Sequence, residues 1–80
     1  MDDSEVLGAI DKLVKEEHEL LTEAEHGGLS DEQRERLRAA QVQLDQCWDL
    51  LRQRRARREF GQNPDDAQVR DANTVERYKA

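Results

Sequence analysis

Residues 26–33 read HGGLSDEQ, and this stretch decides the fold because it ends one helix and begins another. Gly27 is suited to the left-handed backbone conformation that closes a helix. Ser30 is predicted to cap the following helix, and Gln33, three residues later, completes a capping box. A connection of about four residues, 26–29, between two long helices predicts an antiparallel hairpin.

The helix before this turn is predicted from about residue 4 to about residue 25, with Ser4 as its N-cap. Its apolar residues recur at steps of three, four and seven, which places them on one stripe of an α-helix. The stripe consists of Val6, Leu7, Ile10, Leu13, Val14, Leu20, Leu21 and Ala24.

The helix after the turn is predicted from about residue 31 to about residue 59, because Gly61 and Pro64 stop it. Trp48 is its largest apolar side chain and is predicted to be a packing anchor near an edge of the core. It is expected to face Val6, Leu7 and Ile10 of the first helix. The apolar stripe of the second helix consists of Leu37, Ala40, Leu44, Cys47, Trp48 and Leu51.

The C-terminal segment, residues 61–80, differs in character and is predicted to be an arm. Its apolar residues are too widely spaced for a helical stripe, so they suit an extended chain pinned at intervals onto another surface. The apolar residues are Val69, Val75 and Tyr78, together with Phe60 immediately before the segment. Two short helical turns also fit the segment, one around Pro64 with Asn63 as its cap and one over residues 74–79.

The length of 80 residues predicts a single all-α domain, residues 1–80. Because 40% of the residues are charged and only 35% are hydrophobic, a lone hairpin has little core, and we expect a homodimer that forms a four-helix bundle. Val42 and Leu50 lie off the main stripe and are candidates for a second contact. The candidate packing and dimer-interface residues are Leu13, Glu17, Leu20, Leu44, Cys47, Trp48 and Leu51.

Three features predict a cytoplasmic protein without membrane contact. No apolar run approaches the roughly 18 residues of a membrane span. The acidic start, MDDSEV, lacks the positive charge of a signal peptide. The single cysteine cannot form an internal disulfide, which fits a reducing compartment.

Charge is divided between the two predicted helices. Residues 1–33 carry eleven acidic and two basic side chains, whereas residues 34–60 carry eight arginines and four acidic side chains. The whole chain has a net charge of −6. Segments of opposite sign are expected to lie beside each other.

Five arginines fall within seven positions, and they are the candidate partner-docking residues: Arg52, Arg54, Arg55, Arg57 and Arg58. In the predicted hairpin, positions whose numbers sum to roughly 55 face one another. Residues 52–58 are therefore expected beside and just beyond the acidic start of the first helix. Arg52, Arg54 and Arg55, with Arg58 as a further candidate, are expected to pair there with Asp2, Asp3 and Glu5. We interpret the run mainly as a helix end that is neutralised within the protein.

Two functional interpretations of the arginines stay open, docking on an acidic protein surface and binding of nucleic-acid phosphates. The acidic chain, with a pI near 4.8, disfavours nucleic acid, because such domains usually carry a basic surface. Only Trp48 and Phe60 flank the run, so stacking aromatics are also scarce.

The remaining candidates for chemistry are isolated side chains. Glu17 lies within the apolar stripe and is predicted to form a half-buried ion pair or hydrogen bond with a residue of the second helix, from the set Arg34, Arg38 and Gln41. His18 has no carboxylate or second histidine three or four residues away, as a helical metal site requires. Cys47 has no CxxC motif and is interpreted as an apolar filler. Since no phosphate loop or nucleophile elbow is present, we expect no enzyme, metal site or cofactor.

Four blocks carry a resemblance to a known family: EEHEL, EHGGLS, LDQCWDLLRQRRARREFG and VRDANTVERY. On these blocks the chain resembles a family of short, chiefly actinobacterial proteins classed as a domain of unknown function, family 2630. The resemblance implies a small helical protein in which the arginine segment and the tail form one unit, and it supplies no catalytic or binding residues. The expected function is a non-enzymatic helical interaction module that forms a homodimer and docks on a protein partner; Arg-mediated nucleic-acid binding is the alternative.

Overall fold

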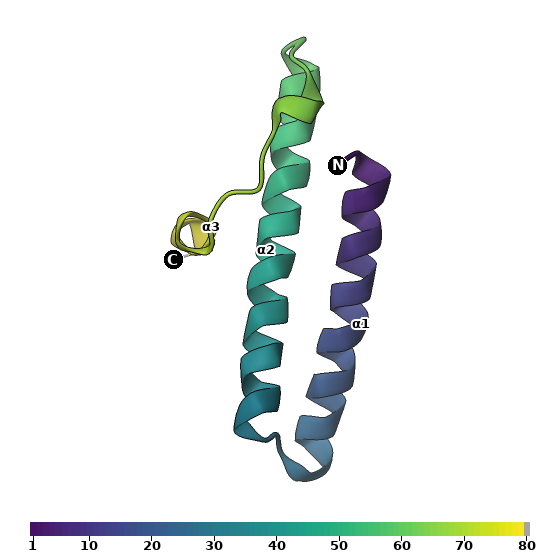
Figure 1. The fold of residues 1–80 in the computed structure, drawn as a ribbon, viewed down its shortest axis with the longest axis vertical. Coiled ribbons are helices and arrows are strands. Elements are labelled where there is room, and N and C mark those ends of the chain that lie inside the picture. The colour runs from purple at the N-terminus through teal and green to yellow at the C-terminus, as the bar shows by residue number, and fades with distance from the viewer. Residues whose placement is uncertain (80) are drawn as a thin grey trace.

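The structure is a computed structural model that describes the backbone of residues 1–79 and the side chains of residues 1–77. The regular elements of this part of the chain are helical: α1 (Asp3–Gly27), α2 (Asp31–Glu59), the 3-10 helix η1 (Pro64–Asp66) and α3 (Ala72–Lys79). The two long helices run antiparallel, and α3 lies beside α2 on the side away from α1 (Figure 1). The predicted all-helical architecture with two long helices is confirmed.

Capping boxes begin both long helices. Asp2 Oδ1 accepts a hydrogen bond from the Glu5 backbone N–H at 2.8 Å, and the Glu5 side chain accepts one from the Asp2 N–H at 3.2 Å. Ser30 and Gln33 make the same reciprocal pair, as predicted. The N-cap of α1 is therefore Asp2, and the prediction of Ser4 was wrong, because Glu5 completes the box with Asp2 and Ser4 lies inside the first turn.

The hairpin turn uses the second glycine of the pair. Helix α1 includes Gly27, and Gly28 follows with φ +84°, a conformation that strains any residue with a Cβ. The left-handed residue was thus predicted one position too early. Across the turn, Gln33 Nε2 donates to Glu23 Oε2 at 2.6 Å, so the two helices are joined close to the point where the chain reverses.

The hydrophobic core lies along the contact between α1 and α2. Its buried centre and the partly buried residues packed against it are Val6, Ile10, Leu44 and Leu50, with Leu13, Cys47, Leu51 and Ala67. Leu20 and Ala40 continue the burial toward the turn. Leu50 was predicted to mark a second contact, and it is 4% exposed in a cluster that includes Ala67 of the tail.

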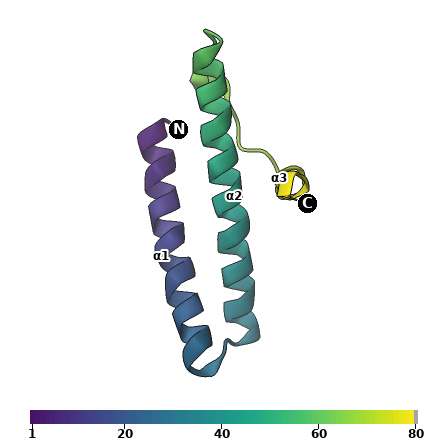
Figure 2. The ribbon, with the colours of Figure 1, turned by 180° about the vertical axis from the view of Figure 1, so that it is seen from behind.

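The tail folds back along α2 as two short helical segments and the chain between them (Figure 2). Asn63 Oδ1 accepts from the Asp65 N–H at 3.0 Å at the start of η1, as predicted for the first turn. Asp71 Oδ1 accepts from the Thr74 N–H at 2.7 Å at the start of α3. The tail is therefore more helical than an extended arm.

The apolar residues predicted to pin the tail behave differently from one another. Val75 is 3% exposed and is buried. Phe60 is 79% exposed and Val69 is 58% exposed, so neither of them pins the chain, and the prediction was wrong for both. The side chain of Tyr78 lies outside the described residues.

The molecule is a single layer of helices, with Cα extents of 50 × 25 × 15 Å. A thin layer leaves apolar side chains of the long helices uncovered, among them Leu7, Val14, Leu21 and Trp48. Within the described residues, no helix combines the length and the apolar character needed to cross a membrane.

Candidate interaction site at the arginine end of the hairpin

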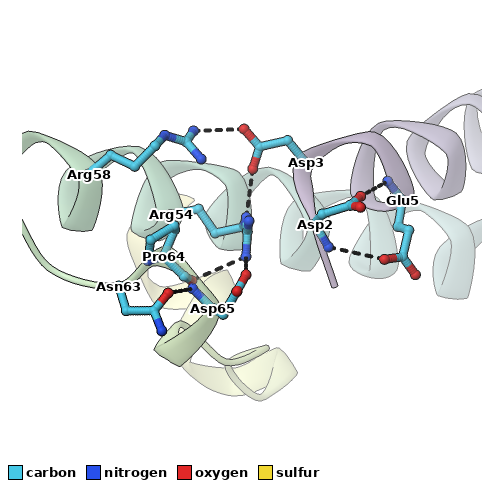
Figure 3. Close-up of polar contacts among 8 residues, drawn as sticks. All are labelled: Asp2, Asp3, Glu5, Arg54, Arg58, Asn63, Pro64 and Asp65. Atoms are coloured by element: carbon cyan, nitrogen blue, oxygen red, sulfur yellow. Dashed lines mark hydrogen bonds and ion pairs between the residues drawn. The ribbon is translucent and has the colours of Figure 1, made fainter.

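Arg54 connects three elements at the end of the hairpin that is remote from the turn. Its Nε donates to Asp3 Oδ1 of α1 at 2.6 Å, and its Nη1 donates to Asp65 Oδ1 at 3.0 Å and to the Pro64 carbonyl at 3.2 Å (Figure 3). The Arg54 residue is only 4% exposed. A buried guanidinium needs several acceptors, and here α1 and η1 supply them.

Asp3 is the carboxylate shared by two arginines. Its Oδ2 accepts from Arg58 Nη2 at 2.7 Å, while its Oδ1 accepts from Arg54 (Figure 3). The hydrogen bonds from Arg58 and then Arg54 lower the pKa of Asp3 below its ordinary value. In turn, the hydrogen bonds from Asp3 and then Asp65 raise the pKa of Arg54. The prediction that acidic residues at the start of α1 neutralise part of the arginine run therefore holds for these two arginines.

The expected pairs of Arg52 and Arg55 are not formed. Asp2 and Glu5, predicted as their partners, bind each other's backbone N–H groups in the capping box. Arg52 and Arg55 are exposed, and neither forms an ion pair with any residue whose side chain the structure describes. Helical geometry explains the division, since Arg54 and Arg58 lie four residues apart on the face toward Asp3, while Arg52 and Arg55 lie on another face.

Arg57 belongs to neither group. It is half-buried, and within the described part of the chain its guanidinium makes no ion pair. Its carbonyl accepts from the Gln62 N–H at 2.7 Å, where the chain leaves α2. Arg57 lies in the last turn of the helix, where its positive charge interacts favourably with the negative end of the helix dipole.

The exposed arginines border a cleft of about 330 Å³, which we call the Trp48 cleft. Leu7 of α1 and Trp48 of α2 form much of its apolar wall and remain 51% and 46% exposed. The residues that line the cleft are Asp3, Leu7, Trp48, Leu51, Arg52, Arg55 and Arg58. The cleft therefore combines an apolar wall with Arg52 and Arg55, which form no ion pair with a described residue, and with the Asp3–Arg58 ion pair.

Trp48 is not the buried anchor that the apolar stripe predicts. It lines the same cleft as Leu7, one of the three residues that it was expected to face, but its position at the edge of the helix contact leaves nearly half of it in solvent. With Arg52 it also borders a second hollow of about 600 Å³ toward the tail, which Asp49, Arg70 and Val75 help to line. Trp48 and Arg52 thus form a ridge between two depressions of the surface.

A polar contact between α2 and the tail was missed by the sequence reasoning. Asp49 is 4% exposed, and its Oδ2 accepts from Gln53 Nε2 at 2.9 Å and lies 3.6 Å from Arg70 Nε. Gln46 and Gln53 also donate to the carbonyls of Arg70 and Gln68, at 3.1 and 2.9 Å. The spacing of Gln46, Asp49 and Gln53 at steps of three and four was a usable signal, although such a polar stripe usually faces solvent.

The other predicted packing residues lie along the helix contact, with one misplaced ion pair. Leu20 and Leu44 are buried, and Leu13, Cys47 and Leu51 are half-buried. Burial raises the pKa of the Cys47 thiol, which fits an apolar filler. Glu17 is half-buried, but it forms no ion pair or hydrogen bond with Arg34, Arg38 or Gln41, so that prediction was wrong. The ion pair that joins the helices here is between Glu16 Oε1 and Arg36 Nη2, at 2.8 Å.

No group of three or more His, Cys, Asp or Glu side chains in the described residues could hold a metal ion. His18 is exposed, and His26 Nδ1 lies 2.8 Å from the Thr22 carbonyl at the end of α1.

The arrangement at the arginine end offers positive charge, hydrogen-bond donors and apolar area. These are the components of a recognition surface.

Comparison with known proteins assigns the chain to a family. Residues 2–80 match the family described as a protein of unknown function (DUF2630), and the chain belongs to this family. Similar relatives are uncharacterised proteins of Mycobacterium bovis and Mycobacterium tuberculosis, which are 52% identical over 77 residues, 95% of this chain and 88% of theirs. No solved structure matches the chain.

Proposed function

We propose that this member of the DUF2630 family is a non-enzymatic, cytoplasmic interaction module that docks on an acidic, amphipathic protein segment. The observation that carries the proposal is the composition of the Trp48 cleft. Two exposed arginines, which form no ion pair with a described residue, lie there beside an exposed apolar wall. Arginine and tryptophan are enriched at the energetic centres of protein interfaces.

The chemistry of the cleft selects the class of partner. Leu7, Trp48 and Leu51 offer apolar contacts, while Arg52 and Arg55 can each bind a carboxylate through a forked pair of hydrogen bonds. A helix with leucines on one face and glutamates beside them would satisfy both requirements in one groove. Nucleic acid fits less well, since the molecule carries a net charge of −6 and Trp48 is the aromatic residue in the cleft.

Trp48 is the only tryptophan, so its fluorescence reports directly on the cleft. A synthetic amphipathic helical peptide of Leu and Glu is titrated into submicromolar protein. We expect the fluorescence of Trp48 to shift until the binding saturates, and we expect the same peptide with Lys in place of Glu to have no effect. The double variant Arg52→Gln/Arg55→Gln should raise the dissociation constant roughly tenfold or more. Arg38→Gln is the matched control, because Arg38 is exposed on α2 but does not line the cleft.

The same variants distinguish the nucleic-acid alternative. Duplex DNA and single-stranded RNA are titrated at several salt concentrations, because phosphate binding weakens steeply with salt. Submicromolar binding of either polymer that Arg52→Gln/Arg55→Gln loses, without binding of the acidic peptide, would overturn the proposal. Arg54 and Arg58 are left unchanged in this test because they hold α1 and η1.

A further inference from the structure

The folded chain exposes more surface than its mass predicts. Its accessible surface is 5995 Å², whereas a compact monomer of 9.3 kDa exposes about 5,000 Å². The excess of about 1,000 Å² is close to the roughly 800 Å² that each partner buries in a standard protein interface. The single layer of helices, 15 Å thick between Cα extremes, is the origin of this excess, because domains usually bury one layer against another.

The uncovered apolar residues of α1 form one line. Leu7, Val14 and Leu21 follow each other at intervals of seven, so they lie on one side of the helix. They are 51%, 46% and 44% exposed, and this stripe begins at the Trp48 cleft, which Leu7 and Trp48 both line. A heptad line of this kind is the pattern by which one helix packs against another.

The stripe is symmetric about Val14, since Leu7 and Leu21 lie equally far from it. Two α1 helices packed antiparallel across a two-fold axis at Val14 would place Leu7 of one copy against Leu21 of the other. Such self-complementarity is what an interface between two identical surfaces requires.

Charge selects the antiparallel direction. Asp3 lies level with Arg54 and Arg58, so it marks the arginine end of α1. Glu25 is as far beyond Val14 as Asp3 is before it, and the two-fold axis therefore brings the arginine end of one copy beside the turn of the other. Glu25 is exposed there, and Asp31, which lies 3.5 Å from Arg34 Nη2 of its own helix, keeps a fully exposed side chain. A parallel arrangement would instead place the arginine ends of the two copies together.

We infer that the first occupant of the Trp48 cleft and the Leu7–Val14–Leu21 stripe is a second copy of this chain, packed antiparallel with Val14 on the two-fold axis. The inference rests on the proposed function, because it names a partner for the same cleft. In this dimer Trp48 is covered by the turn end of the other copy, and Arg52 and Arg55 face its Glu25 and Asp31.

The mass of the particle and its response to one added charge test the inference. Sedimentation equilibrium at micromolar concentration should give about twice the 9.3 kDa chain mass. Val14→Asp, at an exposed position, should leave the helicity unchanged and raise the dimer dissociation constant roughly 100-fold. Val69→Asp is the matched control, since Val69 is an exposed apolar residue of the tail, and it should remain dimeric. A wild-type mass of a single chain, or equal loss in the two variants, would overturn the inference.

Disulfide formation tests the register. In a Cys47→Ala background, Val14→Cys should form a linked dimer under mild oxidation, because the two copies of residue 14 lie on the axis. Leu7→Cys should not, because its neighbour is Leu21 of the other copy. Faster linkage through residue 7 than through residue 14 would contradict the antiparallel register.

The acidic peptide separates failure of this inference from failure of the proposed function. Val14→Asp frees the Trp48 cleft and should bind the peptide more tightly than the wild-type dimer does. A wild-type monomer that binds the peptide would refute the dimer and support the proposed function. A dimer whose Val14→Asp variant does not bind the peptide would refute docking of acidic segments and leave self-association standing.

Discussion

Arg54 and Arg52 lie two residues apart in α2 and have opposite surroundings. Arg54 is 4% exposed and forms ion pairs with Asp3 and Asp65, whereas Arg52 is exposed on the rim of the Trp48 cleft. Successive residues of a helix turn by about 100°, so a run of arginines must divide between faces. The comparison teaches that Arg54 and Arg58, which we call the inner half of the run, hold the fold, whereas Arg52 and Arg55, the outer half, are available for a partner; Arg57 belongs to neither.

The largest effect on stability is expected from the inner half. Arg54→Gln removes the donor that joins α1, α2 and η1 and leaves the Asp3 and Asp65 carboxylates without it. We expect a loss of several degrees in melting temperature and faster proteolysis of the tail, measured by circular dichroism and limited trypsin digestion. Arg55→Gln is the matched control, and both variants are made in the Val14→Asp background so that contacts with a second copy do not contribute. Equal melting temperatures for the two variants would show that Arg54 is no more structural than its exposed neighbour.

A smaller effect is expected at the wall of the cleft. Trp48 is 46% exposed, so Trp48→Ala should cost about 1–2 kcal/mol of unfolding free energy, against about 3–5 kcal/mol for a buried tryptophan. The measurement is urea unfolding followed by circular dichroism in the Val14→Asp background, which removes any contribution from a second copy. A loss of about 4 kcal/mol or more would place Trp48 in the core and contradict the exposed cleft.

The inner half should also make stability depend on acid. The pKa of Asp3 is lowered by Arg58 and Arg54, so its stabilising contribution is present above the unfolded value of 3.8 and is lost as the pH falls through the lower folded value. The pKa of Asp71 is lowered by the Thr74 N–H and adds to the same acid response. Asp3→Asn should therefore flatten the fall in melting temperature below about pH 4.

Asp66→Asn is the control for the acid response, because Asp66 forms no ion pair with a described residue. It should keep the wild-type slope of melting temperature against pH. If Asp3→Asn and Asp66→Asn had the same slope, the pairing of Asp3 with the two arginines would not contribute to stability.

The smallest effect on stability is expected from the outer half. In the Val14→Asp monomer, Arg52→Gln should change the unfolding free energy by less than about 0.5 kcal/mol, as for other exposed substitutions without a partner. In the Val14→Asp monomer, the same substitution should weaken binding of the acidic peptide. A variant that loses stability and keeps its peptide affinity would reverse the assignment of the two halves.

The hairpin could be predicted from sequence because its signals are local. The apolar stripe, the Ser30 capping box and the glycine pair lie within a few residues of the features they determine. The predicted facing of α2 and α1 at the arginine end was also correct for Arg54 and Asp3. Register in an antiparallel hairpin follows from the position of the turn, so little further information was needed.

The remaining features depend on which of several possible partners each side chain binds, and residue spacing does not reveal that choice. Asp2 and Glu5 were available on sequence grounds as partners of the arginines, but the helix N-terminus takes both for capping. A polar stripe that includes Asp49 usually faces solvent, but the tail folds back along α2 and buries this residue. Trp48 fits the apolar stripe, yet a hairpin one layer thick has no second layer to cover it.

The most direct test of the division is the hydrogen exchange of each arginine Nε–H, measured by NMR. The Nε–H of Arg54 is buried and donates to Asp3 at 2.6 Å, so it should give a sharp, slowly exchanging signal at neutral pH. The Nε–H groups of Arg52 and Arg55 should exchange at the rate of free arginine in the Val14→Asp monomer, and slow only when acidic peptide is added. Protection of Arg52 and Arg55 in that monomer without peptide, or fast exchange at Arg54, would contradict the account.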